Sequence, residues 1–193
     1  LPMARILLKE LEHLRPIFVE DAIQFFHVGA LSDLSRTTCI PLVVGERMHS
    51  RFEFKQHFEM RSVSVVNPDV CCVGGISEMV KIAGWAEAYD VALAPHCPIG
   101  PIGLAASLQV DAVCHNAFIQ EQSIGIHYNA GADLLDYIRA KDAFARNDGY
   151  LMIPSGPGLG IDIDEEVVEE RAINGHDWSA PVWRHADGSV AEW

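Results

Sequence analysis

The sequence has few positive charges and no apolar run long enough to span a bilayer. Its 14 lysine and arginine residues face 27 acidic ones, and the formal net charge of -13 makes nucleic acids and anionic membrane surfaces poor partners. The first 14 residues mix lysine and glutamate with apolar side chains and lack a small-residue cleavage site, so we expect no signal peptide there. These features predict a cytoplasmic protein that binds neither nucleic acid nor membrane.

The sequence also lacks regularly spaced cysteine pairs, which does not favour a disulfide scaffold. No two of the five cysteines form a C-x-x-C pair, and their odd number favours a reduced, intracellular protein. The adjacent pair Cys71-Cys72 raises the alternative of a thiol site. Because adjacent side chains at a strand end point apart, we expect these two to pack as buried apolar groups instead.

Short β-rich runs alternate with helical patterns along the first 125 residues. This alternation predicts parallel strands joined by crossover helices, and the runs of Val, Ile and Leu predict strands covered on both faces. The expected strands are 17–19, 41–45, 63–66, 91–94 and 117–119. The expected helices are about 3–15, 28–37, 50–60, 76–89 and 101–115.

Five such units predict an α/β fold, and two arrangements fit the pattern. One is part of a (β/α)8 barrel, and the other is a five-stranded doubly wound sheet, although no G-x-G-x-x-G or Walker sequence supports a nucleotide site in it. We divide the chain into a partial barrel, 1–125, and a C-terminal segment, 126–193, that contains the loop 154–160. This segment is expected to end in a β-hairpin turning at Asp187-Gly188, with its tryptophans packed against the barrel: Trp178, Trp183 and Trp193.

Polar residues stand at the C-terminal end of each successive predicted strand. In a parallel barrel, side chains at these ends meet at the face where active sites are built. Converging carboxylates repel one another unless they are protonated or bind a cation, and carboxylate oxygens suit Mg²⁺. The residues are Glu20, Glu46, Asp69, His96 and Glu121.

Taken singly, each of these residues has an ordinary structural explanation. Glu20 or Glu46 alone is typical of a solvated loop carboxylate, Glu121 alone is a weak signal, and His96 alone fits a structural and a functional role equally. Asp69, which follows Asn67-Pro68, is typical of a turn residue or helix cap. Their placement after five consecutive strands favours the functional interpretation. The histidines that lack this placement are expected at the surface: His127, His176 and His185.

At these residues the sequence resembles the mandelate racemase branch of the enolase superfamily. The resemblance covers essentially the whole chain and implies strands four to eight of the barrel, with the capping domain and the first three strands outside it. The segments that carry it include FVED (18–21), VVGERMHSRFEFK (43–55), VVNPDVCCVGGISE (65–78), APHCPIGPI (94–102), NAFIQEQSIGIHYN (116–129) and PVWRHADGSVAEW (181–193).

The resemblance implies a role for each strand-end residue. Glu20 and Glu46 would be two of three Mg²⁺ ligands, Asp69 and His96 a catalytic dyad, and Glu121 a carboxylate that bonds the substrate opposite the metal. The implied reaction is dehydration of a sugar acid such as D-galactonate. His96 would remove a proton next to the carboxylate, Mg²⁺ would stabilise the ene-diolate, and loss of water would give a 2-keto-3-deoxy acid. Full-length members are expected to form homo-oligomers.

Two features depart from the pattern of this branch. The usual Glu-Glu-Pro after the fourth strand reads Glu20-Asp21-Ala22, so we expect a perturbed loop that keeps the ligand position. The third metal carboxylate and an acid histidine are expected in a part not contained in these 193 residues. Three alternatives therefore stay open: another sugar acid, racemisation in place of dehydration, or an inactive fragment that only associates with another chain.

Overall fold

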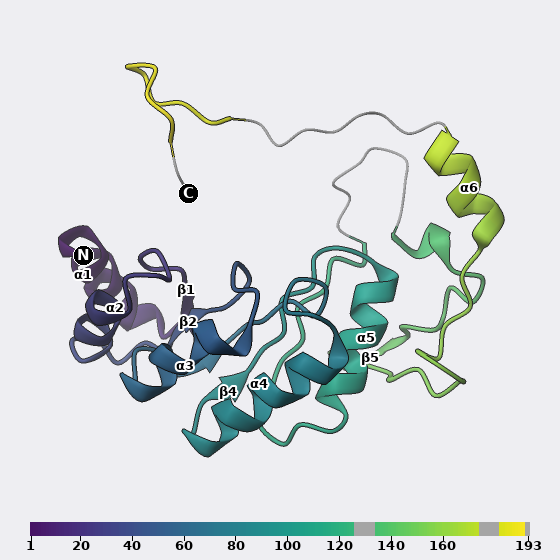
Figure 1. Cartoon of the computed structure of the whole chain (residues 1–193), viewed down its shortest axis with the longest axis horizontal. Helices are drawn as coiled ribbons and strands as arrows, with labels where there is room; N and C mark the ends of the chain where they lie inside the picture. The colour runs from purple at the N-terminus through teal and green to yellow at the C-terminus, as the bar shows by residue number, and fades with distance from the viewer. Residues whose placement is uncertain (126–133, 174–181, 192–193) are drawn as a thin grey trace.

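The computed structural model describes residues 1–125, 134–173 and 182–191. Its main sheet holds four short strands, and helices lie between them in the sequence (Figure 1). The strands are β1 (Val19–Glu20), β2 (Leu42–Val44), β3 (Val65–Val66) and β4 (Ala92–Leu93). The helices of this part are α1 (Pro2–Leu11), η1 (Glu12–Leu14), α2 (Val28–Ser35), α3 (Arg51–Glu59), α4 (Ile76–Ala88) and α5 (Pro101–Asp111).

The strands are parallel and follow one another in chain order, β1-β2-β3-β4. Val43 of β2 is in register with Glu20 on one side and with Val65 on the other. The fifth predicted strand is reduced to a parallel bridge between Leu93 and Ala117, where Phe118 N–H donates to Leu93 O. The predicted parallel α/β architecture is therefore confirmed, with strands shorter than their apolar runs.

Local sequence signals explain where the helices begin. Ser50 and Glu53 form a capping box at the start of α3, in which each side chain bonds the other residue's backbone N–H. Helix α4 begins after Gly74-Gly75, whose φ angles of 103° and 89° suit glycine. Helix α5 begins at Pro101, where a missing N–H costs no helical bond.

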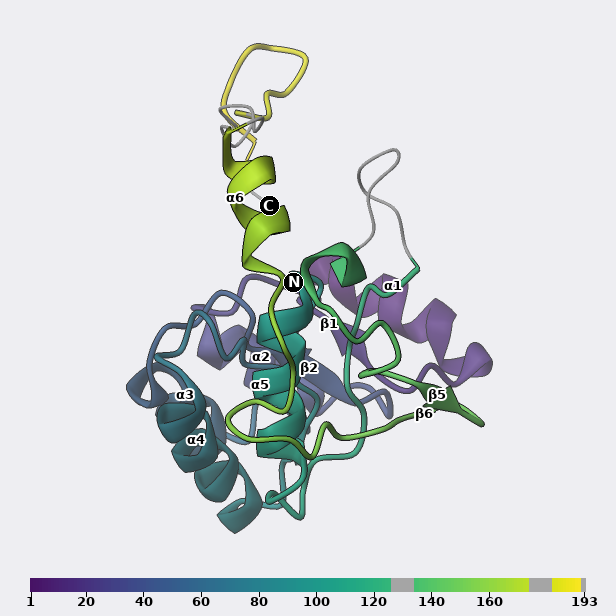
Figure 2. The same ribbon diagram turned by 90° about the vertical axis from the view of Figure 1, so that its right-hand side faces the viewer.

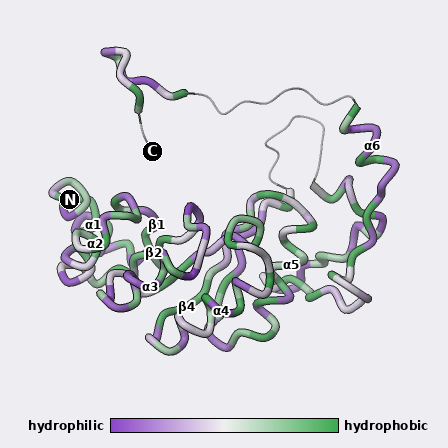
Figure 3. Tube along the Cα trace, in the orientation of Figure 1, coloured by the Kyte–Doolittle hydropathy of each residue, from purple (hydrophilic) through white to green (hydrophobic). Residues whose placement is uncertain are grey.

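The helices cover one face of the sheet, and α2, α3, α4 and α5 contact their neighbours in chain order (Figure 2). The main core lies between this helical layer and the sheet, and hydrophobic residues recur through both (Figure 3). The opposite face carries a smaller cluster built on Val43, Val65 and Ala94, with Phe18 packed against it. The Phe18 ring also lies 6.4 Å from that of Phe118, centre to centre. Phe18, which precedes β1, and Phe118, which follows the bridge at Ala117, therefore meet across this face, as the curvature of a barrel segment requires.

The second part of the chain contributes its own elements. These are η2 (Leu134–Tyr137), the antiparallel pair β5 (Arg146–Asn147) and β6 (Tyr150–Leu151), and α6 (Glu165–Ile173). Ile138 and Phe144 are buried in a cluster with Leu104 and Leu108 of α5, so residues after 134 pack on the last barrel helix. The division at residue 125 stays a prediction.

The chain end forms a local turn. Arg184 and Val190 make an antiparallel bridge around Asp187-Gly188, and Gly188 has a φ of 86°. Trp183 is 57% exposed, whereas Trp178 and Trp193 lie outside the described residues. Packing of the tryptophans on the barrel stays a prediction.

The cysteine pair differs from the expectation. Cys71 and Cys72 are both exposed, so the prediction that they pack as buried apolar groups is wrong. Both cysteines lie in the turn between β3 and α4. The sheet and the helices do not cover both sides of the chain in this turn, so the two side chains stay accessible to solvent. All five cysteines are free, and Cys97 is buried.

His185 is exposed, as predicted, and His127 and His176 lie outside the described residues. Of the helices that the structure describes, none has the length and hydropathy needed to cross a bilayer.

Candidate active site

The five strand-end residues converge at one edge of the sheet, because the ends of parallel strands lie together. Four of them line a cavity of about 540 Å³, which we call the strand-end cavity, and Asp69 lies behind His96. The cavity is lined by Glu20, Asp21, Ile23, Gln24, Glu46, Arg47, His96 and Glu121.

His96 is held by carboxylates at both ring nitrogens. Its Nδ1 lies 2.9 Å from Asp69 Oδ2, and its Nε2 lies 3.0 Å from Glu46 Oε2 and 3.9 Å from Glu121 Oε2. The backbones of Asp69 and His96 pair as a parallel bridge, so the sheet register places this dyad. Asp69 is 2% exposed, and its Oδ1 accepts the N–H of Cys71 at 2.7 Å. The carboxylate of Asp69 is thereby fixed to orient the ring.

These contacts raise the pKa of His96. Burial alone opposes the charged imidazolium, but the hydrogen bond that His96 donates to Asp69 and the charges of Glu121 and Glu46 outweigh it. A histidine with a raised pKa accepts a proton more strongly than a free one, as a general base must.

Glu20 is the last residue of β1 and accepts a hydrogen bond from buried Asn67, whose Nδ2 lies 2.5 Å from Glu20 Oε1. Burial raises the pKa of Glu20, the Asn67 bond lowers it, and the nearby charges of Glu46, Asp21 and Glu121 raise it further. Asn67 comes this close because its neighbour across the sheet is Gly45. A Cβ on Gly45 would lie 2.8 Å from the backbone of Asn67.

Glu121 closes the other side of the cavity. Its Oε2 accepts the N–H of buried Cys97 at 3.1 Å, and its side chain is 50% exposed. It therefore keeps an accessible oxygen for a polar ligand.

The sequence did not reveal that Asp21 and Arg47 belong to the same cavity. Arg47 Nη2 lies 2.5 Å from Asp21 Oδ2, and each residue directly follows a strand-end glutamate. The one hint in the sequence was the repeated spacing of 26 residues, from Glu20 to Glu46 and from Asp21 to Arg47, which places both pairs at the ends of β1 and β2.

The donor types at the cavity suit Mg²⁺, but the ligand set is partial. Glu20 and Glu46 supply carboxylate oxygens. Burial and, after it, repulsion by neighbouring carboxylates raise the pKa of Glu20, and a cation would relieve that repulsion. Among residues 1–125, 134–173 and 182–191, no group of three or more His, Cys, Asp or Glu side chains is arranged to hold a metal. The two glutamates therefore fit Mg²⁺ as part of a larger set.

The family model described as enolase C-terminal domain-like matches residues 1–167. The chain belongs to this family. Within it, the chain is 57% identical over 192 residues to D-galactonate dehydratase of Ralstonia pickettii and 55% identical to that of Variovorax paradoxus. Each match covers all of this chain and 50% of the relative, so the chain spans about half the length of these relatives.

Solved enolase-like structures show the same fold. An enolase from Agrobacterium radiobacter, bound to Na and L-malate, is 32% identical with a TM-score of 0.84, over 97% of this chain and 49% of that one. A mandelate racemase/muconate lactonizing enzyme-like protein from Roseovarius sp. is 30% identical with a TM-score of 0.78, over 86% and 40%. Of the two predicted arrangements, the partial barrel of the enolase type is therefore confirmed, and the doubly wound sheet is not.

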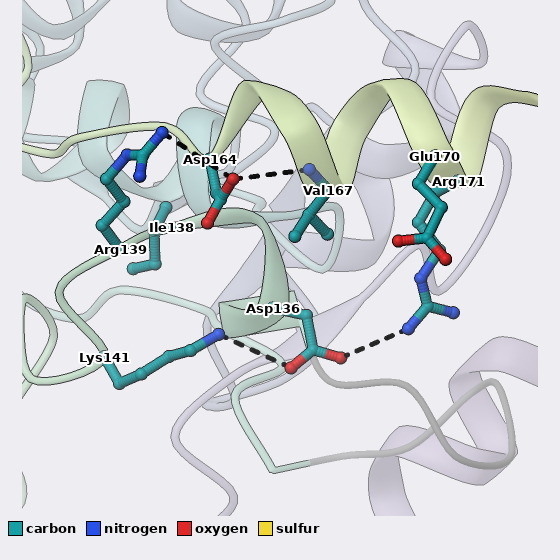
Figure 4. A pocket seen from close by; sticks show the side chains of 8 residues that line it. All are labelled: Asp136, Ile138, Arg139, Lys141, Asp164, Val167, Glu170 and Arg171. Carbon is teal, nitrogen blue, oxygen red and sulfur yellow. Dashed lines mark hydrogen bonds and ion pairs between the residues drawn. The ribbon is translucent and has the colours of Figure 1, made fainter.

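A second cavity, of about 700 Å³, shares no lining residue with the strand-end cavity (Figure 4). Acidic and basic side chains that line this cavity form ion pairs with one another. Asp136 lies 3.6 Å from Lys141 and 3.8 Å from Arg171, and Arg139 lies 3.8 Å from Asp164. Three cations and three anions line it, so it offers a charged ligand no excess of either sign.

Proposed function

We propose that the full-length protein containing this chain is a Mg²⁺-dependent hydro-lyase that dehydrates a sugar acid, with D-galactonate as the first candidate. The observation that carries the proposal is the Asp69–His96 dyad beside Glu20, Glu46 and Glu121 in one cavity. Relatives at 55–57% identity carry the name D-galactonate dehydratase. A related structure holds L-malate, a hydroxy acid like D-galactonate.

In this proposal His96 is the base that removes the proton next to the substrate carboxylate. Asp69 holds Nδ1 and thereby directs Nε2 into the cavity, so Nε2 is the nitrogen that accepts the proton. In the structure Glu46 contacts that same Nε2 at 3.0 Å. Substrate binding must therefore replace the Glu46 contact before His96 can act.

The other carboxylates bind and orient. Glu20 and Glu46 would hold Mg²⁺, and the ion would supply stabilisation for the negative oxygens of the ene-diolate. Glu121 would accept a hydrogen bond from a substrate hydroxyl with the oxygen that faces the cavity. We place the enzyme in the cytoplasm, where its free thiols would stay reduced, and expect a homo-oligomer at full length.

A chimera tests this function. The part of the Ralstonia pickettii protein that this chain does not match is joined to the 193 residues, and 2-keto product is followed with D-galactonate and Mg²⁺. We expect turnover that requires Mg²⁺ and falls by at least about 10³-fold in His96→Asn, because the base is lost. His185→Asn, an exposed histidine, is the matched control and should keep full activity. Unchanged turnover in His96→Asn would remove His96 from the mechanism.

A further inference from the structure

The loops that follow β1 and β2 are tied together by an ion pair. Glu20 is followed by Asp21 and Glu46 by Arg47, and Arg47 Nη2 lies 2.5 Å from Asp21 Oδ2. The direct chain neighbours of the two proposed cation ligands therefore contact each other. Residues 21–27 contain no proline, so no ring restricts the backbone of the first loop.

The surroundings favour a well-defined pair. The side chains of Arg47 and Asp21 are 31% and 21% exposed, so water screens their attraction less than at an open surface. The guanidinium carbon of Arg47 also lies 5.7 Å from the centre of the Phe25 ring, within cation–π range. Asp21 N–H donates to Val43 O, which fixes the backbone at the end of β1. The positions of Asp21 and Arg47 are therefore both restrained by contacts outside the ion pair.

We propose that the Asp21–Arg47 pair is a clamp that positions Glu20 and Glu46 relative to each other and thereby sets the affinity of the cavity for a divalent cation. This inference rests on the proposed function, since it takes the two glutamates as ligands. Arg47 Nε also lies 3.9 Å from Glu46 Oε1, so Arg47 restrains this glutamate directly as well as through the backbone. Asp21 and Arg47 are positioning residues.

Charge alone makes a different prediction from the clamp. Removing the Asp21 carboxylate makes the cavity less negative and weakens cation binding under either explanation. Removing the Arg47 guanidinium makes the cavity more negative, so electrostatics alone predicts tighter binding. The clamp predicts weaker binding, because the two glutamates lose their fixed separation. The sign of the change in an Arg47 variant therefore separates the two explanations.

The experiment titrates Mn²⁺ into the full-length chimera described above and follows the free ion by electron paramagnetic resonance. We expect about tenfold weaker binding in both Asp21→Asn and Arg47→Gln. Arg36→Gln removes an arginine that is 71% exposed and pairs with Asp33 on the surface, and it should bind Mn²⁺ like the wild type. The thermal unfolding midpoint verifies that each variant is folded.

Arg47→Lys covers the case in which Arg47→Gln does not fold. It keeps the positive charge but lacks the planar fork of donors, so it should also bind Mn²⁺ more weakly. Binding as tight as the wild type in the folded Arg47 variants overturns the clamp alone. A chimera without substitutions that binds no Mn²⁺, or a Glu20→Gln variant that binds it normally, overturns the cation site and the clamp together.

Discussion

Replacing Asp111 with asparagine should stabilise the protein increasingly as the pH rises. Asp111 is the last residue of α5, and burial raises the pKa of its carboxyl from 3.8 to about 7. Its Oδ1 is buried and accepts no hydrogen bond from the described residues. The folded protein therefore holds a proton that the unfolded chain releases, and each further rise in pH favours the unfolded chain.

The sign and the size of this pH dependence of stability follow from the linkage between proton binding and folding. An acid whose pKa is raised on folding contributes its full stability below pH 3.8, and this contribution is lost as the pH rises through about 7. At about 1.4 kcal/mol per pH unit, the loss for Asp111 is about 4 kcal/mol by pH 8. About 2.5 kcal/mol of it falls between pH 5 and pH 8. Water reaching the carboxyl would lower these figures, so they are upper bounds.

The assay is urea unfolding followed by circular dichroism at pH 5, 6.5 and 8. The free energy of unfolding of Asp111→Asn, relative to wild type, should rise over this range by up to about 2.5 kcal/mol. Asp142→Asn, at an exposed position, is the control and should show a constant difference. A difference for Asp111→Asn that does not change with pH would refute the argument that burial holds this carboxyl neutral.

Two further substitutions test how the cavity is built. Gly45→Ala should cost about 1–3 kcal/mol of unfolding free energy, because the new Cβ would lie 2.8 Å from the Asn67 backbone. Gly29→Ala, in α2 with nothing within 4 Å, should not destabilise, and equal Tm shifts for the two would contradict the close approach. Asn67→Leu should weaken Mn²⁺ binding about tenfold without lowering stability, because the buried amide mainly orients Glu20. Lower stability with unchanged Mn²⁺ affinity would make Asn67 purely structural.

The periodicity of the sequence was enough to predict the first part of the fold. Apolar runs of strand length separated by amphipathic helices predicted the parallel order and the positions of α2 to α5 within a few residues. The acidic helix α6 was missed, because EEVVEERAI buries no residue and has no apolar face to recognise. Cys71 and Cys72 were misplaced for a related reason: their apolar character matched a strand, but the chain had already entered a turn.

The candidate site was predictable in its membership but not in its contacts. Strand-end positions identified Glu46 and His96, since parallel strands bring such ends together. Periodicity carries no information on side-chain pairing, so the contact of Glu46 with His96 Nε2 and the Asp21–Arg47 pair required coordinates. Both depend on rotamers and loop paths, which are determined by packing across residues distant in sequence.

The most direct test of the account is to locate the cation itself. Crystals of the full-length chimera grown with Mn²⁺ should show an anomalous scattering peak beside the carboxylates of Glu20 and Glu46, which would hold the ion. His96 should lie beside it, with Nε2 released from Glu46. A fully occupied peak elsewhere, with Glu46 still bonded to His96, would contradict the proposed site.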